Sequence, residues 1–168
     1  MSKKEELEAL GYKTYENDKI AVFWNPNICQ HAGLCVKGNN LVFDVSRRPW
    51  IDLSKASAIE IAKVIDECPS KALQYELKIN IEFDLSDNMS IASIGDEVIG
   101  ECEFESEDDT WTILHTGVDE AYGGRGIAKK LVISVADAAI KYNKKIVPLC
   151  TYAKKVLENN DEYKKIIG

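Results

Sequence analysis

The sequence predicts an α+β protein built from two small domains, residues 1–77 and residues 78–168. Helix-like and strand-like hydrophobic patterns occur in both halves, which favours a mixed class. The charge pattern changes near residue 77, because no lysine or arginine occurs between Ile79 and Gly124. The second half also has its own order of elements: three successive strand patterns, a glycine-rich turn and a helix.

The first half begins with an amphipathic helix that Gly11 closes, and a hairpin follows. The segment CQHAGLC, Cys29 to Cys35, contains small, polar and flexible residues, which favour a loop. In order, the predicted elements are a helix over residues 2–11, a hairpin over 12–24, a loop over 29–35, a short apolar segment over 41–43, a helix over 55–66 and a strand over 72–77.

The second half has a meander pattern, in which Glu101, Glu103 and Glu105 alternate with Cys102 and Phe104 as in a half-buried strand. The acidic residues either form the solvent-exposed face of an antiparallel sheet or create a negative electrostatic field that attracts a cationic amine substrate. In order, the predicted elements are strands over residues 88–94, 98–105 and 110–118, a helix after the glycine turn, a strand over 145–149 and one or two helices over 151–168.

Composition limits the classes of function. The formal net charge is −7, which disfavours nucleic acid as a partner because phosphate neutralisation needs a basic face. No apolar run approaches the length of a membrane span, and the first residues are charged, so we expect a cytoplasmic protein that does not enter a membrane. Five cysteines, an odd number, favour reduced thiols that can bind metals or do chemistry.

The cysteine spacing indicates a metal site. A bacterial-type cluster loop is C-x2-C-x2-C with a remote Cys-Pro. Cys29, Ala32 and Cys35 occupy the three loop positions, and Cys68 precedes a proline, so the middle ligand is absent. Three thiolates can hold a 3Fe-4S cluster, or a 4Fe-4S cluster whose fourth iron takes a non-cysteine ligand, for which His31 is the nearest candidate.

Two alternatives remain open for this first site. Zinc held by Cys29, His31, Cys35 and Cys68 is chemically reasonable, because these are zinc ligand types. The cysteines could instead be buried without a ligand, and His31 could be an ordinary loop histidine.

Residues 12–77 resemble the divergent single-cluster iron-sulfur domain family, small ferredoxin-like bacterial proteins. The blocks that carry the resemblance are CQHAGLC, VFD, RRPWID and CPSKALQYE, in that order. The resemblance implies a ferredoxin-like fold and an iron-sulfur cluster held by Cys29, Cys35 and Cys68, with the fourth site open.

The glycine turn is the second candidate site. Gly123, Gly124 and Gly126 surround Arg125 between a strand and a helix. Backbone N–H groups in such a turn can point at an anion, and the helix dipole favours negative charge there. The turn matches neither a phosphate-binding G-x-x-x-x-G-K loop nor the dinucleotide fingerprint.

From about Asn88 onward the chain is similar to the short GNAT-type acetyltransferases, a family with a trimmed mixed-sheet fold. The matching blocks are GEC, HTGV, GGRGIAKKLV and VPLCTYAKK. The resemblance implies acetyl-CoA binding, with the strand that ends at Val118 offering backbone groups to the pantetheine arm. The residues implied to contact the phosphates are Gly124, Arg125, Gly126, Ile127, Ala128 and Lys129.

Two residues are candidates for the chemistry of transfer. Cys150 lies where a strand gives way to a helix N-terminus, which lowers a thiol pKa, so it could act as acid or base, accept the acetyl group or merely fill a gap. His115 is either a base near the reacting centre or a core residue of a strand. Tyr152 is a lesser candidate, and Cys102 is expected in the core.

The sequence therefore predicts a ferredoxin-like iron-sulfur domain followed by a trimmed GNAT-like domain. Its function would be acetyl transfer from acetyl-CoA to an unknown amine, with the cluster acting as a redox sensor or a structural staple. The alternative is an electron carrier with a redox partner protein, whose second domain only binds coenzyme A or another protein.

Overall fold

The computed structural model of the chain describes all 168 residues, and they form two compact units, Met1–Lys78 and Ile79–Gly168. Lys78 alone separates the last strand of the first unit from the first strand of the second. No helix in either unit has the length and apolar character needed to cross a membrane.

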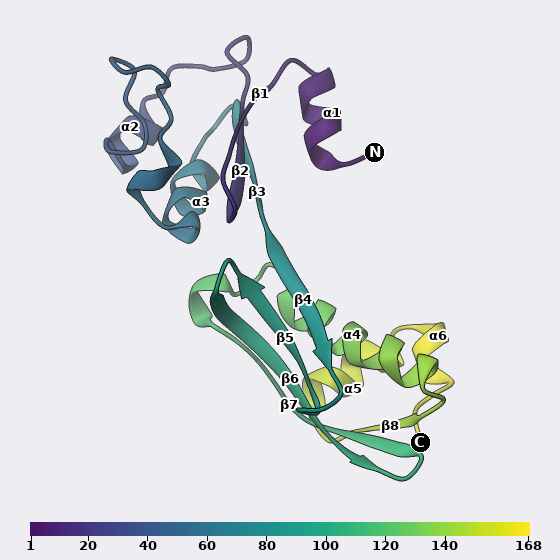
Figure 1. Ribbon diagram of the computed structural model, residues 1–168. Helices are drawn as coiled ribbons and strands as arrows, with labels where there is room; N and C mark the ends of the chain where they lie inside the picture. The colour runs from purple at the N-terminus through teal and green to yellow at the C-terminus, as the bar shows by residue number, and fades with distance from the viewer. The chain divides into compact units, whose positions relative to one another are not determined.

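The first unit contains a three-stranded antiparallel sheet of order β1-β2-β3, whose central strand is fully buried apart from its last residue (Figure 1). This arrangement confirms the predicted hairpin. The elements of this unit are α1 (Lys3–Ala9), β1 (Lys13–Glu16), β2 (Ile20–Trp24), α2 (Leu34–Gly38), the short 3-10 helix η1 (Leu53–Lys55), α3 (Ala58–Asp66) and β3 (Leu73–Leu77).

The two longer helices of the first unit begin at matching N-terminal signals. The Ser2 and Ser57 side chains each accept from the backbone N–H three residues on, and the glutamate at that position accepts from the serine N–H. Because Ser57 caps α3, this helix begins at Ala58 rather than near Lys55 as predicted. Residues before the cap form η1 instead.

The cysteine segment is not entirely a loop. Cys35 lies in the first turn of α2, so the prediction of a loop through Cys35 is wrong for its last residues. Gly33 adopts a φ of +74° at the N-cap of α2, a conformation that glycine reaches without strain. The loop therefore ends at Gly33, before Cys35, because α2 begins at Leu34.

Aromatic side chains complete the core of the first unit. The Trp50 ring meets the edge of Trp24 with ring centroids 4.9 Å apart, and it lies 5.8 Å from Phe43. The contacts among these rings pack the segment before α3 against β2, which also contributes the buried Phe23.

The second unit is a five-stranded mixed sheet of order β4-β5-β6-β7-β8, antiparallel except for the parallel pair β7-β8. The predicted meander and the predicted α+β class are confirmed. The strand at residues 79–84 was not predicted. The elements are β4 (Ile79–Asp84), β5 (Met89–Ile94), β6 (Glu97–Glu107), β7 (Thr110–Val118), η2 (Glu120–Tyr122), α4 (Ile127–Lys141), β8 (Lys145–Pro148), α5 (Thr151–Glu158) and α6 (Asp161–Lys164).

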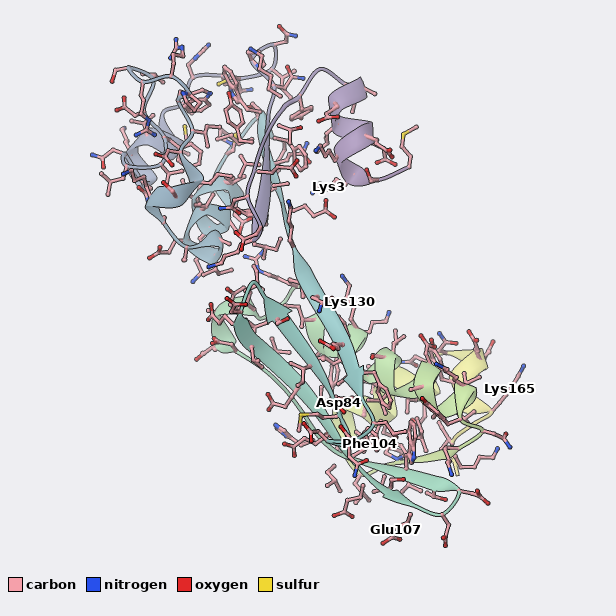
Figure 2. The ribbon with its side chains drawn as sticks, in the orientation of Figure 1. Lys3, Asp84, Phe104, Glu107, Lys130 and Lys165 are labelled. Carbon is pink, nitrogen blue, oxygen red and sulfur yellow. The ribbon has the colours of Figure 1, made fainter.

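Helix α4 packs against one face of this sheet (Figure 1). On β6, Cys102 and Phe104 are buried while Glu103 and Glu105 are exposed, which confirms the predicted alternation. The strand ends in the exposed Glu107, beside the turn to β7 (Figure 2). The acidic residues of β6 therefore form a solvated sheet face.

Helix α4 supplies much of the second core. Its buried side chains lie on one stripe, and the helix lies against every strand of the sheet. The Tyr163 hydroxyl of α6 donates a hydrogen bond of 2.7 Å to the Asp137 carboxylate of α4, which fixes the end of the chain against this helix. The buried residues of α4 are Ile127, Leu131, Val132, Val135, Ala136, Ala138 and Ala139.

Candidate functional site

The first unit contains a cavity of about 510 Å³ between the cysteine segment, the start of β3 and the Trp50 segment. All four predicted metal ligands, Cys29, His31, Cys35 and Cys68, line it. The remaining wall is largely apolar or aromatic. Its residues include Tyr15, Trp24, Leu34, Val36, Val45, Pro49, Trp50, Pro69 and Leu73.

Asn25 fixes the chain that leads into the cysteine segment. This residue is only 5% exposed, and its backbone N–H donates to the Ala72 carbonyl at 2.8 Å. Its amide donates to the Leu10 carbonyl, and its side-chain oxygen accepts from the Asn27 N–H. One buried polar residue thus ties the ligand segment to the strand after Cys68, a role that the Asn-Pro-Asn turn signal alone did not reveal.

The thiols in this cavity have different proton affinities. Burial would raise the pKa of Cys68, but hydrogen bonds from the Leu73, Ser70 and Ala72 amides and the Ser70 hydroxyl lower it overall. Burial raises the pKa of Cys35, and the charges of Cys29 and Cys68 raise it further. Cys29 lies 3.9 Å from the His31 ring, measured from Sγ to Nδ1.

The donor set of the cavity fits an iron-sulfur cluster. The structure contains no group of three or more His, Cys, Asp or Glu side chains placed to hold one metal ion. A cluster makes a different demand, since each thiolate binds its own iron across an extended inorganic core. Three thiols and one imidazole around a largely apolar cavity meet that demand.

The glycine turn of the second unit opens at the N-terminus of α4. Gly124 and Gly126 have φ values of +74° and +76°, and a Cβ added at either would meet no atom within 4 Å. Gly126 is the N-cap and offers no side-chain cap to the first amides of the helix. The backbone N–H groups at Ile127, Ala128 and Lys129 therefore have no side-chain cap, and uncapped groups of this kind suit an anion.

Strand β7 has an open edge next to this turn. It pairs with β8 only from Thr110 to Ile113, and both Leu149 N–H and Cys150 N–H donate to the Ile113 carbonyl as the chain turns away. On its other side, β7 continues to pair with β6 as far as Val118. From Leu114 to Val118 the edge away from β6 forms no ladder, so its backbone groups can bind an extended chain.

Cys150 is the N-cap of α5 and is partly exposed. Burial acts to raise its pKa, but the Ala153 and Tyr152 amides and the Thr116 hydroxyl together lower it, although no amide forms a regular capping bond. Its Sγ lies 3.8 Å from Thr116 Oγ1, which in turn lies 3.4 Å from Cys102 Sγ. Cys102 is fully buried, as predicted for a core residue.

Sequence reasoning did not single out Thr116. The residue lies directly opposite Cys102 in the β6-β7 register, on the same side of the sheet. The proximity of Thr116 to Cys150 can be recognised only when the strand register is known, because nothing in the local sequence connects the two residues.

His115 does not belong to the core. Its side chain is 61% exposed, and Nε2 lies 3.7 Å from the Glu101 carboxylate on β6. Gly117 makes this approach possible, because a Cβ there would come within 2.8 Å of the His115 ring. The interpretation of His115 as a buried strand residue is therefore wrong, and its role as a base stays a prediction.

Two families match separate parts of the chain. The divergent 4Fe-4S mono-cluster family matches residues 15–78, and the GCN5-related N-acetyl-transferase family matches residues 89–166. The Escherichia coli K12 protein YjdI is 47% identical over 68 residues, which cover 40% of this chain and 90% of YjdI. YjdI of E. coli O157:H7 matches to the same extent.

Several solved structures are similar to part of this chain. A GCN5-like protein from Staphylococcus aureus, solved by NMR, is 31% identical over 53% of this chain and 87% of its own, with a TM-score of 0.43. The E. coli GNAT protein YhbS, crystallised with CoA, is 26% identical over 39% of this chain and 43% of its own, with a TM-score of 0.35. From the sequence matches, the chain belongs to the divergent 4Fe-4S mono-cluster family through residues 15–78 and to the GCN5-related N-acetyltransferases through residues 89–166.

Proposed function

We propose that the first unit holds an iron-sulfur cluster through Cys29, Cys35 and Cys68, with His31 the nearest candidate for a fourth ligand. The proposal is supported by the cavity that all four side chains line and by the lowered pKa of Cys68, since the thiolate is the ligand form. When bound, such a cluster supplies one-electron transfer. The apolar wall around Trp24 and Trp50 limits the access of water to it.

The second unit, in this proposal, binds acetyl-CoA and transfers the acetyl group to an amine. The observation that carries this function is the open edge of β7 from Leu114 to Val118 beside the open glycine turn. The amides of the pantetheine arm would bond to the strand edge, and the phosphates would lie against the first amides of α4 with Arg125 and Lys129 near them. No side chain from the turn competes for this space at Gly124 or Gly126.

Cys150 supplies the nucleophile. Its thiolate attacks the thioester carbonyl carbon, the coenzyme A thiolate leaves, and Sγ carries the acetyl group as a thioester. A deprotonated amine then attacks this carbonyl, the Cys150 thiolate leaves as the amide bond forms, and the amine proton neutralises the coenzyme A thiolate. His115, whose side chain is 61% exposed, is the candidate base that takes this proton from the amine.

Two measurements test the transfer. Acetyl-CoA without an amine should place one acetyl group on Cys150, detected by peptide mass spectrometry, and Cys150→Ser should abolish it while Cys102→Ser retains it. Addition of a panel of amines should then give release of coenzyme A thiol beyond the first equivalent, because the amine regenerates the Cys150 thiolate. If coenzyme A binds and no amine gives thiol release, the chain is an electron carrier whose second unit only binds the nucleotide.

The glycine turn can be tested separately with a matched pair of variants at the two ends of α4. Gly126→Ala places a side chain at a φ of +76° and over the first amides, so coenzyme A affinity should fall by about tenfold. Asn143 also has positive φ, +54°, at the far end of the helix, and Asn143→Ala should leave affinity unchanged. Equal loss in both variants would place the phosphates elsewhere.

The cluster, in this proposal, also sets the activity of the second unit. This coupling is supported by the direct connection between the units, since Lys78 is the only residue between β3 and β4. Loss of the cluster in Cys68→Ser should change acetyl-CoA affinity or the melting of the second unit. Unchanged affinity and unchanged melting in Cys68→Ser would reduce the cluster to a separate function in the same chain.

A further inference from the structure

Three polar side chains from three elements meet beneath the proposed acetyl site. Cys102 comes from β6, Thr116 from β7 and Cys150 from the start of α5. The Thr116 hydroxyl accepts from the Cys150 thiol at 3.8 Å and donates to Cys102 Sγ at 3.4 Å. The fold fixes all three, because Cys102 and Thr116 are opposite in register and the Cys150 N–H bonds to the Ile113 carbonyl.

The direction of these hydrogen bonds has to change when Cys150 loses its proton. A thiolate has no hydrogen to donate and becomes an acceptor. The Thr116 hydroxyl can rotate its single hydrogen from Cys102 to Cys150 without moving a heavy atom. Cys102 keeps its own hydrogen, since burial raises its pKa to about 11, and it can then donate to Thr116 Oγ1.

We propose that Thr116 is a positioning residue that holds Cys150 as a thiolate, by turning its hydroxyl from Cys102 to Cys150 when the Cys150 proton leaves. The buried Cys102 thiol supports it as a reserve donor, so that the chain Cys102, Thr116, Cys150 reverses direction as a unit. This inference rests on the proposed role of Cys150 in acetyl transfer.

Other groups around Cys150 act alongside this chain. The Ala153 and Tyr152 amides from α5 and the Thr116 amide from β7 also lower the pKa of Cys150. From β6, the Glu103 charge acts on Cys102 and raises its pKa, which keeps the reserve donor protonated. His115 on β7 pairs with Glu101 at 3.7 Å. These backbone amides survive side-chain substitution, so the contribution of the Thr116 hydroxyl can be isolated.

The test is the pH dependence of Cys150 alkylation by iodoacetamide in the full chain, followed by mass spectrometry of the peptide that contains Cys150. Thr116→Val keeps the shape and the strand preference but removes the hydroxyl, so the midpoint should rise by about one pH unit. Alkylation near neutral pH should become about tenfold slower. Thr116→Ser should restore the midpoint, and Cys102→Ala should move it upward by less than Thr116→Val.

An unchanged midpoint in a folded Thr116→Val protein would overturn the proposal. If this variant does not fold, judged by circular dichroism, Cys102→Ala decides: an upward shift supports the chain and no shift overturns it. A purely structural role of Thr116 would change melting without moving the midpoint. Failure of the proposed acetyl transfer is a separate outcome. If Cys150→Ser retained release of coenzyme A thiol, Cys150 would not be the nucleophile. A shifted alkylation midpoint of Cys150 in Thr116→Val would still support the role of Thr116.

Discussion

Cys35 and Cys150 each stand at the start of a helix, yet their thiols differ. Cys35 lies in the first turn of α2, and burial raises its pKa. Cys150 caps α5, and the hydrogen bonds around it outweigh burial and lower its pKa. A helix start alone does not activate a thiol, because burial outweighs the Val36 and Cys35 amides at Cys35, whereas the donors around Cys150 outweigh burial. In the proposed function, this difference separates a thiol that would bind a cluster from a thiol that would act as a nucleophile.

The largest expected effect is in alkylation of the second unit. Cys102 has a pKa of about 11, whereas that of Cys150 lies below 9.0, so the thiolate fraction of Cys150 at neutral pH should be more than about a hundredfold greater. Burial of Cys102 slows it further. Peptide mass spectrometry after timed alkylation measures both, and the urea-unfolded chain is the control in which they should react alike. Rates within about tenfold in the folded protein would contradict the comparison.

A smaller effect concerns the packing that holds Cys35 near Cys68. A Cβ at Gly38, which ends α2, would lie 2.9 Å from a Val64 methyl on α3. Gly38→Ala should therefore destabilise the first unit by about 1–3 kcal/mol and reduce its iron content. Chemical denaturation monitored by tryptophan fluorescence and metal analysis measure the two effects.

The control for this packing prediction removes the obstruction. Val64→Ala combined with Gly38→Ala should recover iron content relative to Gly38→Ala alone, because the added methyl then has space. Alkylation of Cys150 should be the same in all of these proteins. Loss of iron that Val64→Ala does not rescue would show that Gly38 acts in another way.

The smallest expected effect is a pH dependence confined to the second unit. Burial, and then the hydrogen bond to Asp137, raise the pKa of Tyr163 from 10.0 to about 12. The protonated hydroxyl stabilises the fold fully below pH 10, and this stabilisation is lost as pH rises toward 12. Thermal melts between pH 9 and pH 12, about the range of a tyrosine titration, should show this decline.

Tyr163→Phe should be less stable at neutral pH by about 1 kcal/mol and should lose the part of the alkaline decline that Tyr163 causes. Tyr142→Phe is the control, because Tyr142 is 43% exposed and lies at the end of the same α4 helix that carries Asp137. An identical alkaline decline in Tyr163→Phe and in the parent chain would refute the assignment.

Most elements could be predicted from local signals, and the exceptions have physical reasons. The hairpin, the meander and α4 follow from hydrophobic period and turn residues. The segment at residues 79–84 was missed although Ile79, Ile81 and Phe83 alternate with polar residues, because a strand that follows another strand after one residue has no turn signal between them. Helix α2 was missed because it is too short to show a period.

The sites were only partly predictable. The ligand types at Cys29, Cys35 and Cys68 can be identified from spacing, and the structure places them on one cavity. The exposure of His115 could not be predicted from the sequence, because a bulge in β7 shifts the register of this strand against β6. Thr116 contacts Cys102 and Cys150, which lie far from it in the chain, and such contacts become visible only in the folded sheet.

The most direct measurement is the iron, sulfide and zinc content of the protein purified without oxygen, with an absorption spectrum, for the parent chain, Cys68→Ser and Cys150→Ser. The comparison of the two units predicts brown protein with similar amounts of iron and sulfide in the parent chain and in Cys150→Ser, and their loss in Cys68→Ser. Colourless parent protein with one zinc and no iron per chain would contradict it, as would equal loss of iron in the two variants.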